Sequence, residues 1–188
     1  MPASAIRRAR QGLVFARGFF SNPLRVGSVV PSSPQLVARL LAPVDWSTAR
    51  TVVEYGPGTG VVTRAILARL PADGRLIAFE VNPEFVGFLR REINDPRLTV
   101  VMASAESVAD HVAAADAVVS SLPFSIMPRS VSQRILAATA AVLAPGAPLV
   151  GYQYSTAWLK MLRRAFGDVG LRFEPRNWPP AFVYTARV

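Results

Sequence analysis

The chain of 188 residues has the length of one domain and is long enough to bury a hydrophobic core. It contains no cysteine, which excludes disulfides, thiol nucleophiles and zinc–thiolate sites, and its one histidine, His111, leaves little room for a histidine metal site, so we expect no metal. The net charge of +9 arises almost entirely from arginine and favours an anionic partner, either nucleic acid or a membrane surface with anionic lipid. Although the mean hydropathy is +0.30, no apolar run reaches the length of about 18 residues that a transmembrane helix needs.

Residues 3–20 predict a basic amphipathic helix. On a helical wheel of about 100° per residue, bulky apolar side chains such as Leu13 occupy one arc and arginines the opposite one. The side chains expected to meet lipid are Arg7, Arg8, Arg10, Arg17, Phe19 and Phe20. Such a helix lies in the headgroup region of a bilayer or packs on the protein with its arginines in solvent, and the sequence leaves both open. The segment lacks a small-residue cleavage site and is a poor signal peptide.

The rest of the chain alternates between predicted strands and helices. Ser32 or Ser33 can cap a helix over residues 34–41. Further on, strands are predicted near residues 50–55, 75–80, 97–102, 115–120, 147–153, 168–174 and 180–187, and helices near 60–70, 83–94, 105–112, 129–143 and 155–166. This alternation predicts an α/β fold, a single Rossmann-like domain whose seven-stranded, mostly parallel sheet has helices on both faces and an antiparallel pair at its end. We place this domain at residues 33–188, after an N-terminal helix and lid segment over residues 1–32.

A glycine turn follows the first of these strands. Gly56, Gly58 and Gly60 let the backbone turn sharply and approach a ligand more closely than a Cβ would allow. Because the turn joins a strand to a helix N-terminus, it has the geometry of a nucleotide-binding βα unit. Glu54 lies just before the glycines, where a carboxylate would repel a pyrophosphate but suits an amine-bearing ligand. Glu80 ends the second strand, where a carboxylate can accept both hydroxyls of a ribose.

This E-x-G-x-G-x-G pattern resembles motif I of the class I S-adenosylmethionine-dependent methyltransferases, which implies S-adenosylmethionine as the cofactor. Ligands of such sheets bind outside the carboxyl ends of the strands. At the end of the third strand, related enzymes place an acidic residue beside the adenine amino group, whereas this chain has Ser104, with Glu106 two residues later. The predicted cofactor-binding residues are Val30, Ser32, Glu54, Gly56, Gly58, Thr59, Gly60, Glu80, Val81, Ser104, Ala105, Glu106, Ser120 and Leu122.

The loop after the fourth strand, Ser121-Leu122-Pro123-Phe124, is similar to a loop in a second family. It resembles the Asn-Leu-Pro-Tyr/Phe loop of the ribosomal RNA adenine-N6 dimethyltransferases, whose Asn side chain and prolyl backbone polarise the target amine. Ser121 replaces that asparagine and removes the amide acceptor for an adenine amine. The sequence also ends at Val188, without the C-terminal helical lobe of those enzymes. An RNA adenine-N6 methyltransferase remains an alternative, as does a non-catalytic binding protein that keeps the fold.

Over nearly its whole length, the chain is more similar to the bacterial phospholipid N-methyltransferases of the soluble PmtA-like kind. The shared features are the basic N-terminal helix, the segment 27–33 (Gly-Ser-Val-Val-Pro-Ser-Ser), the glycine motif, the Ser120-x-Leu122-Pro123 loop and the segment 153–155 (Gln-Tyr-Ser). The resemblance implies stepwise methylation of phosphatidylethanolamine to phosphatidylcholine. It also implies a phospholipid substrate and an anionic membrane surface as partners, and a cytoplasmic protein peripherally associated with the inner membrane.

Candidate catalytic residues lie at the ends of the fourth and fifth strands. Methyl transfer to an amine depends mainly on alignment and on the exclusion of water. Tyr154 is the candidate for orienting the amine or relaying its proton, and Ser121 is the second catalytic candidate. Phe124, Trp158 and Trp178 either face a methylated ammonium through cation–π contacts or belong to ordinary packing.

Overall fold

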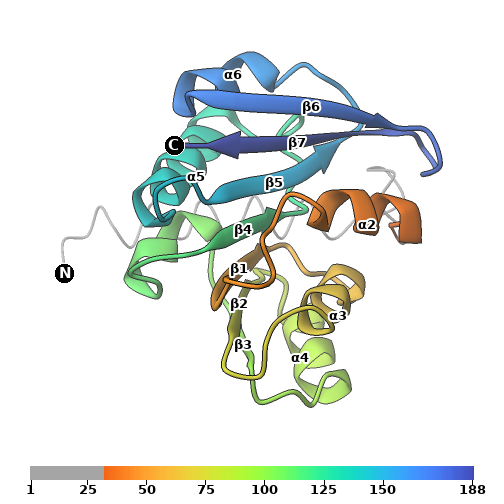
Figure 1. The fold of residues 1–188 in the computed structure, drawn as a ribbon, viewed down its shortest axis with the longest axis vertical. Helices are drawn as coiled ribbons and strands as arrows, with labels where there is room; N and C mark the ends of the chain where they lie inside the picture. Colours follow the sequence, from red (N-terminus) through yellow and green to blue (C-terminus); the bar gives the residue numbers. More distant parts are fainter. Residues whose placement is uncertain (1–31) are drawn as a thin grey trace.

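The computed structural model describes residues 32–188 (Figure 1). The predicted N-terminal helix therefore lies outside the described residues. So do its predicted lipid-contacting side chains and one predicted cofactor residue, namely Arg7, Arg8, Arg10, Arg17, Phe19, Phe20 and Val30.

One sheet of seven strands organises the described part of the chain, in the order β3-β2-β1-β4-β5-β7-β6. The strands are β1 (Thr51–Tyr55), β2 (Arg75–Phe79), β3 (Leu98–Val101), β4 (Ala117–Ser120), β5 (Pro148–Gln153), β6 (Asp168–Glu174) and β7 (Ala181–Arg187). Neighbouring strands among β1 to β5 pair in parallel, whereas β7 lies between β5 and β6 and runs antiparallel to both. The predicted sheet and its final antiparallel pair are confirmed.

Helices cover both faces of the sheet. They are α2 (Pro34–Leu41), α3 (Val61–Leu67), α4 (Pro83–Glu92), the 3-10 helix η2 (Ala105–Asp110), α5 (Arg129–Val142) and α6 (Leu159–Ala165). Because side chains alternate along a strand, β1 sends Val52 to the core that includes α2 and α3, and sends Val53 and Tyr55 to the core that includes α5 and α6. A strand buried on both faces needs apolar residues throughout, which explains why polar exceptions such as Glu54 stand out.

Local capping fixes where two of these helices begin. Ser33 is the N-cap of α2 and its Oγ accepts the Leu36 N–H at 3.1 Å, while Pro34 occupies the first helical turn. Asn82 does the same for α4, accepting the Glu84 N–H at 2.9 Å. Of the two predicted caps for α2, Ser33 is thus the one observed. Within residues 32–188, no helix has the length and apolarity to cross a bilayer.

Gly151 of β5 provides a test of the packing at the centre of the sheet. A Cβ at this position would lie 2.0 Å from the Tyr184 Oη and 2.8 Å from the Ser120 carbonyl oxygen. Gly151→Ala should therefore lower the free energy of unfolding by about 3 kcal/mol or more, and Tyr184→Phe in the same chain should restore part of the loss. Gly170→Ala on β6 is the control, because its nearest atom is 3.9 Å away. Equal denaturation midpoints for the two alanine variants would contradict this packing.

Candidate functional site

The strand register brings five loops to one edge of the sheet. Tyr55, at the end of β1, pairs with Phe79 of β2 and Ser120 of β4, and the pairing continues to Val101 of β3 and Gly151 of β5. The loops that follow these strands therefore meet at the carboxyl edge, where α2 also lies (Figure 1). This edge gathers the predicted site residues that the structure describes.

The three glycines of the turn have different roles. Gly56, Gly58 and Gly60 all have positive φ, at 67°, 54° and 79°, which disfavours other residues there. A Cβ on Gly56 would lie 3.2 Å from the Leu122 Cδ2, so this glycine lets the loop after β4 pack against the turn. A Cβ on Gly60 would lie 2.8 Å from Ile93, so this glycine lets α3 approach α4.

Gly58 is the one that opens toward a ligand. A Cβ built on Gly58 meets no protein atom within 4 Å. Its N–H points to the Glu80 Oε2 at 3.2 Å, so the peptide lines the space between the ends of β1 and β2. Thr59, the next residue, is exposed, and its carbonyl accepts the Arg64 Nη1–H at 3.0 Å. The space that a ligand can enter is therefore beside Gly58.

Glu54 is a fully buried carboxyl group with one oxygen unpaired. Its Oε2 accepts the Thr63 hydroxyl at 2.7 Å, whereas Oε1 has no hydrogen-bond partner. Burial, opposed by the Thr63 bond and reinforced by the negative charge of Glu80, raises the pKa of Glu54 to about 8. An unpaired buried acceptor costs stability, and a cationic ligand with N–H donors would offset that cost.

Glu80 is held in place by backbone amides. Its Oε1 accepts the N–H groups of Val81 at 2.8 Å and Asn82 at 2.9 Å, and its Oε2 accepts that of Gly58. Burial nevertheless raises the pKa of Glu80, because only 2% of the residue is exposed. An ionised carboxylate has about four lone-pair positions, so three backbone bonds leave capacity for a ribose hydroxyl. This leaves room for one hydroxyl rather than the predicted two, and the Val81 N–H is already donated to Glu80.

The residues after β3 are placed differently from one another. The Ser104 Oγ accepts the Glu106 N–H at 3.3 Å and caps η2, so its hydroxyl is engaged locally. Ala105 is buried in the core and its side chain packs there. The Glu106 carboxylate forms an ion pair with Arg134 of α5, so a ligand must compete with that guanidinium.

Gln153 fixes the loop after β4 and was missed as a site residue. Its Nε2 donates to the Leu122 carbonyl at 2.7 Å and its Oε1 accepts the Ser125 N–H at 3.1 Å. Ser120 is fully buried, and its Oγ accepts the Leu122 N–H at 3.3 Å. The Ser121 N–H donates to the Tyr55 carbonyl at 2.9 Å, which continues the β-ladder into the loop. We call these two side-chain bonds the Gln153 clamp. The signal for it in the sequence is a glutamine at the end of an otherwise apolar strand.

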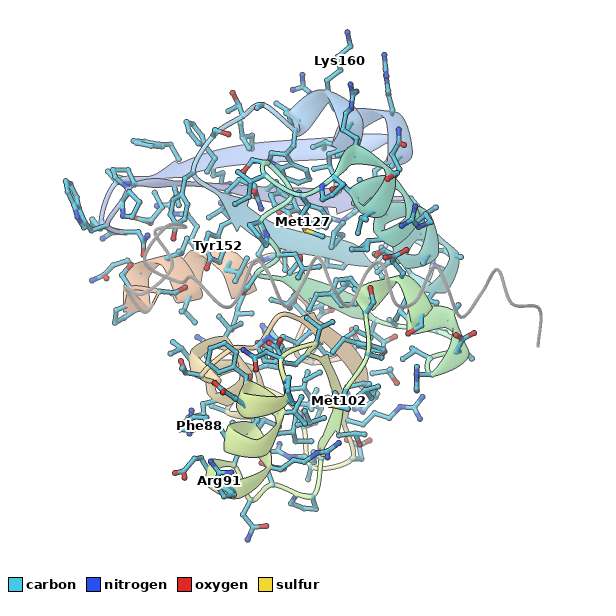
Figure 2. The ribbon with its side chains drawn as sticks, turned by 180° about the vertical axis from the view of Figure 1, so that it is seen from behind. Phe88, Arg91, Met102, Met127, Tyr152 and Lys160 are labelled. Atoms are coloured by element: carbon cyan, nitrogen blue, oxygen red, sulfur yellow. The ribbon has the colours of Figure 1, made fainter. Side chains whose placement is uncertain are left out.

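The N-terminus of α2 is tied to the last strands by side chains distant in sequence. The Ser32 hydroxyl donates to the Tyr152 Oη at 3.3 Å, and Figure 2 shows Tyr152 beside α2. The Ser33 N–H donates to the Asn177 Oδ1 at 3.0 Å. Tyr154 packs edge-on against Tyr152, with ring centroids 5.9 Å apart. Burial and the neighbouring Tyr152 raise the pKa of Tyr154 to about 12, although a hydrogen bond from Asn177 opposes the rise.

The three aromatic candidates for a cation–π contact separate into core and surface. Phe124 is 2% exposed and stacks on Trp158 at 5.3 Å, and Trp158 packs against Tyr184 at 4.3 Å. The structure thus places Phe124 and Trp158 in the core, where the two rings stack. This corrects the predicted substrate contact of Phe124 and selects ordinary packing, one of the two alternatives, for Trp158. Trp178 is 77% exposed in the turn between β6 and β7.

The geometry fits a ligand with a nucleoside and a positively charged group. The opening beside Gly58, the spare capacity of Glu80 and the unpaired Oε1 of Glu54 match the sugar and the ammonium of S-adenosylmethionine. In the part of the chain that the structure describes, no group of three or more His, Cys, Asp or Glu side chains could hold a metal ion.

Comparison with known proteins identifies the family of the chain. Residues 52–146 match the family described as a methyltransferase domain. Over 181 residues, the chain is 33% identical to the ornithine lipid N-methyltransferase of Singulisphaera acidiphila, covering 93% of this chain and 94% of that protein. The chain therefore belongs to the class I S-adenosylmethionine-dependent methyltransferases, and S-adenosylmethionine is its cofactor.

Two further similarities are more limited. A stretch of 85 residues is 42% identical to the ribosomal RNA small subunit methyltransferase H of Aromatoleum aromaticum, covering 43% of this chain and 27% of that protein. The crystal structure of precorrin-6y C5,15-methyltransferase from Geobacter metallireducens superimposes with a TM-score of 0.71 at 18% identity, covering 86% of this chain and 93% of that one. At that identity the structural match supports the fold alone.

Gly58→Val tests the opening beside the glycine turn. The branched side chain fills space that no protein atom occupies, so S-adenosylhomocysteine should lose measurable binding in calorimetric titration, whereas the wild type binds one per chain. Gly146→Val is the matched control, because Gly146 also has positive φ, at 75°, and open space around it. Both variants should lose about 1–2 kcal/mol of stability from backbone strain, and only Gly58→Val should lose binding. Equal affinities in the two variants would contradict the site.

The raised pKa of Glu54 predicts how stability depends on pH. In the unfolded chain this group ionises near its ordinary pKa of 4.5, while in the folded protein it keeps its proton until about pH 8. The unfolded state therefore binds fewer protons in that window, and stability falls as pH rises from about 5 to 8. Glu54→Gln should flatten this fall in denaturant midpoints, leaving the smaller contribution of Glu80. Parallel pH profiles for wild type and variant would show that Glu54 ionises normally.

Proposed function

We propose that this protein transfers methyl groups from S-adenosylmethionine to the amine of a membrane lipid. The observation that carries the proposal is the 33% identity to a lipid N-methyltransferase across 93% of this chain. The net charge of +9 supports it, since such a protein is attracted to a surface of anionic lipid. The predicted basic helix over residues 3–20 would hold the protein at the cytoplasmic face of the inner membrane as a peripheral protein.

Two lipid amines are candidate acceptors. The sequence resemblance favours phosphatidylethanolamine and its methylated derivatives, with phosphatidylcholine as the final product. The relative's name favours an ornithine lipid. Both acceptors are amines attached to membrane lipids, so they make the same demand on the site: an amine must reach the carboxyl edge of the sheet from the bilayer side.

In this proposal the residues of the chain bind the cofactor, align the acceptor amine with it and exclude water from the site. S-adenosylmethionine, when bound, supplies an electrophilic methyl group on its sulfonium. Glu54, Gly58 and Glu80 would hold it through the contacts described above. The Gln153 clamp fixes the loop after β4 at the edge where the acceptor enters. An amine must lose its proton before it reacts, and a partly apolar pocket lowers the pKa of the amine and assists this loss.

Tyr154 is suited to orient the amine. Its pKa of about 12 keeps the hydroxyl neutral at physiological pH, so its oxygen can accept an amine N–H but the group does not act as a phenolate base. The residue is 39% exposed, just beyond the end of β5, so a substrate can reach it. This favours the orienting role over the proton relay.

RNA methylation is the second candidate function, supported by the net charge and by the partial match to a ribosomal RNA methyltransferase. The loop after β4 argues against adenine-N6 chemistry. The Leu122 carbonyl already accepts the Gln153 Nε2–H and the Phe124 N–H, and the Pro123 carbonyl accepts the N–H groups of Ile126 and Met127. Both lone pairs of each carbonyl are thus engaged within the protein. Ser121 has no side-chain amide oxygen that could accept the adenine N–H in their place.

Incubation with methyl-labelled S-adenosylmethionine tests the proposal. Separate reactions contain micellar phosphatidylethanolamine, an ornithine lipid or ribosomal RNA. We expect label in at least one lipid and none in RNA, with Gly58→Val inactive and Gly146→Val active as matched controls. Label in RNA alone would overturn the proposal, and binding of S-adenosylhomocysteine without any transfer would indicate a non-catalytic protein.

Tyr154→Phe tests the orienting role. Loss of one hydrogen bond to the reacting amine should reduce kcat about tenfold, with cofactor affinity unchanged. The pH profile of kcat should keep its shape between about pH 6 and 9, because the hydroxyl does not ionise there. Tyr152→Phe, which removes a neighbouring hydroxyl bonded to Ser32, should leave kcat within about twofold. An ionisation lost from the profile would instead identify Tyr154 as a base.

A further inference from the structure

The hairpin formed by β6 and β7 has an exposed end at the same edge as the cofactor site. Phe182 of β7 pairs with Gln153 at the end of β5, and Glu174 of β6 pairs with Ala181. We call residues 172–182 the hairpin tip. Figure 1 shows this tip beside α2, beyond the arrowhead of β5. Whatever contacts the hairpin tip also lies next to the edge where the methyl acceptor must enter.

Large apolar side chains project from the hairpin tip into solvent. Trp178 is 77% exposed and Phe173 is 51% exposed, and the ring of Phe173 lies 5.2 Å from that of Phe182. Among residues 32–188, β6 is the last strand of the sheet, and none of these residues forms a further strand along its outer edge. The exposed Trp178 and the Phe173–Phe182 pair belong to the same hairpin tip, and several exposed aromatic side chains on one short segment indicate a contact surface.

Arginines of the hairpin tip and of α2 lie together beside these aromatic residues. Arg39, Arg172 and Arg176 line an open groove of about 520 Å³ between α2 and β6. Glu174 is fully buried below them and bonds to Arg39 at 2.6 Å and Arg176 at 3.1 Å. Two guanidiniums bond to this carboxylate and Arg172 adds a third positive charge to the lining, which leaves the groove positively charged.

The Asn177 side chain holds the turn of the hairpin tip in one conformation. Its Nδ2 donates to the Pro179 carbonyl at 2.8 Å, and its Oδ1 accepts the Ser33 N–H. The side chain is buried, with 4% of the residue exposed, so the turn is fixed against the N-terminus of α2. The backbone of the turn that carries Arg176 and Trp178 is therefore held in place before any partner arrives.

We infer that the hairpin tip docks onto a bilayer with anionic lipid, placing Trp178 among the headgroups and the arginines of the groove against lipid phosphates. Tryptophan favours the water–lipid interface, and arginine buries its stem while its head contacts phosphate. Charge complementarity selects anionic lipid as the occupant over an uncharged protein face. The inference rests on the proposed function and adds a membrane contact on the folded domain, separate from the N-terminal helix.

Tryptophan fluorescence of the full chain tests this docking. The chain has three tryptophans, and Trp158 is buried, so Trp178→Phe removes the most exposed emitter. On addition of equimolar phosphatidylcholine and phosphatidylglycerol vesicles, we expect a blue shift and reduced acrylamide quenching, both absent in Trp178→Phe. Vesicles that sediment the chain without either change would overturn the inference. So would protection of Trp178 before lipid is added, which would indicate a second protein copy on this surface, or a response to RNA alone.

Two double variants that each replace two arginines by glutamine test the contribution of the groove to membrane binding. Arg172→Gln with Arg176→Gln leaves Arg39 to pair with Glu174, and should weaken binding to the anionic vesicles at least about tenfold, since each arginine near such a surface contributes about fivefold. Arg163→Gln with Arg164→Gln is the control, because it makes the same change in net charge on exposed residues of α6. These residues precede the start of β6, at the end of the strand away from the hairpin tip, so vesicle binding should weaken less than about threefold. Equal weakening in both pairs would overturn the inference. Lipid methylation in detergent micelles, measured alongside, tests the proposed function independently of docking.

Discussion

Two buried carboxyl groups, at the ends of adjacent parallel strands, are the main electrostatic constraint on the candidate site. Glu54 lies in β1 and Glu80 directly follows the neighbouring strand β2. Burial and, to a lesser extent, the negative charge of Glu80 raise the pKa of Glu54. Backbone amides satisfy Glu80, whereas Glu54 has a single hydroxyl partner. A fold that buries two acids is less stable without a cation, and a ligand with a sulfonium and an ammonium supplies one. We therefore expect the unpaired Glu54 oxygen to contribute to the affinity for such a ligand.

The acceptor side of the site is built in a different way. Its parts come from segments far apart in sequence, and amide side chains hold them together: Gln153 fixes the loop after β4, and Asn177 fixes the hairpin turn to Ser33. A buried amide can donate and accept at once, so each joins two segments with one side chain. The proposed cofactor side depends on local βα geometry, while the proposed acceptor side depends on long-range contacts.

The local geometry of the strands and of the glycine turn could be predicted from the sequence, whereas the long-range packing around the site could not, for physical reasons. Periodicity and the glycine pattern report local geometry, so the strands, their antiparallel pair and the cap at Ser33 were all predictable. The separate roles of Gly56, Gly58 and Gly60 were not, because they depend on Leu122 and α4 packing from elsewhere. Phe124 could be assigned to substrate or core from its type alone, and only the three-dimensional fold places it against Trp158.

Proton release on ligand binding tests the central claim about Glu54 most directly. Calorimetric titration with S-adenosylhomocysteine at pH 7, repeated in buffers of different ionisation enthalpy, counts the protons exchanged. With a pKa of about 8, Glu54 holds its proton in the free protein and should release close to one per chain when the ligand ammonium replaces it, and Glu54→Gln should release none. No proton release from the wild type, or equal release from the variant, would contradict the account.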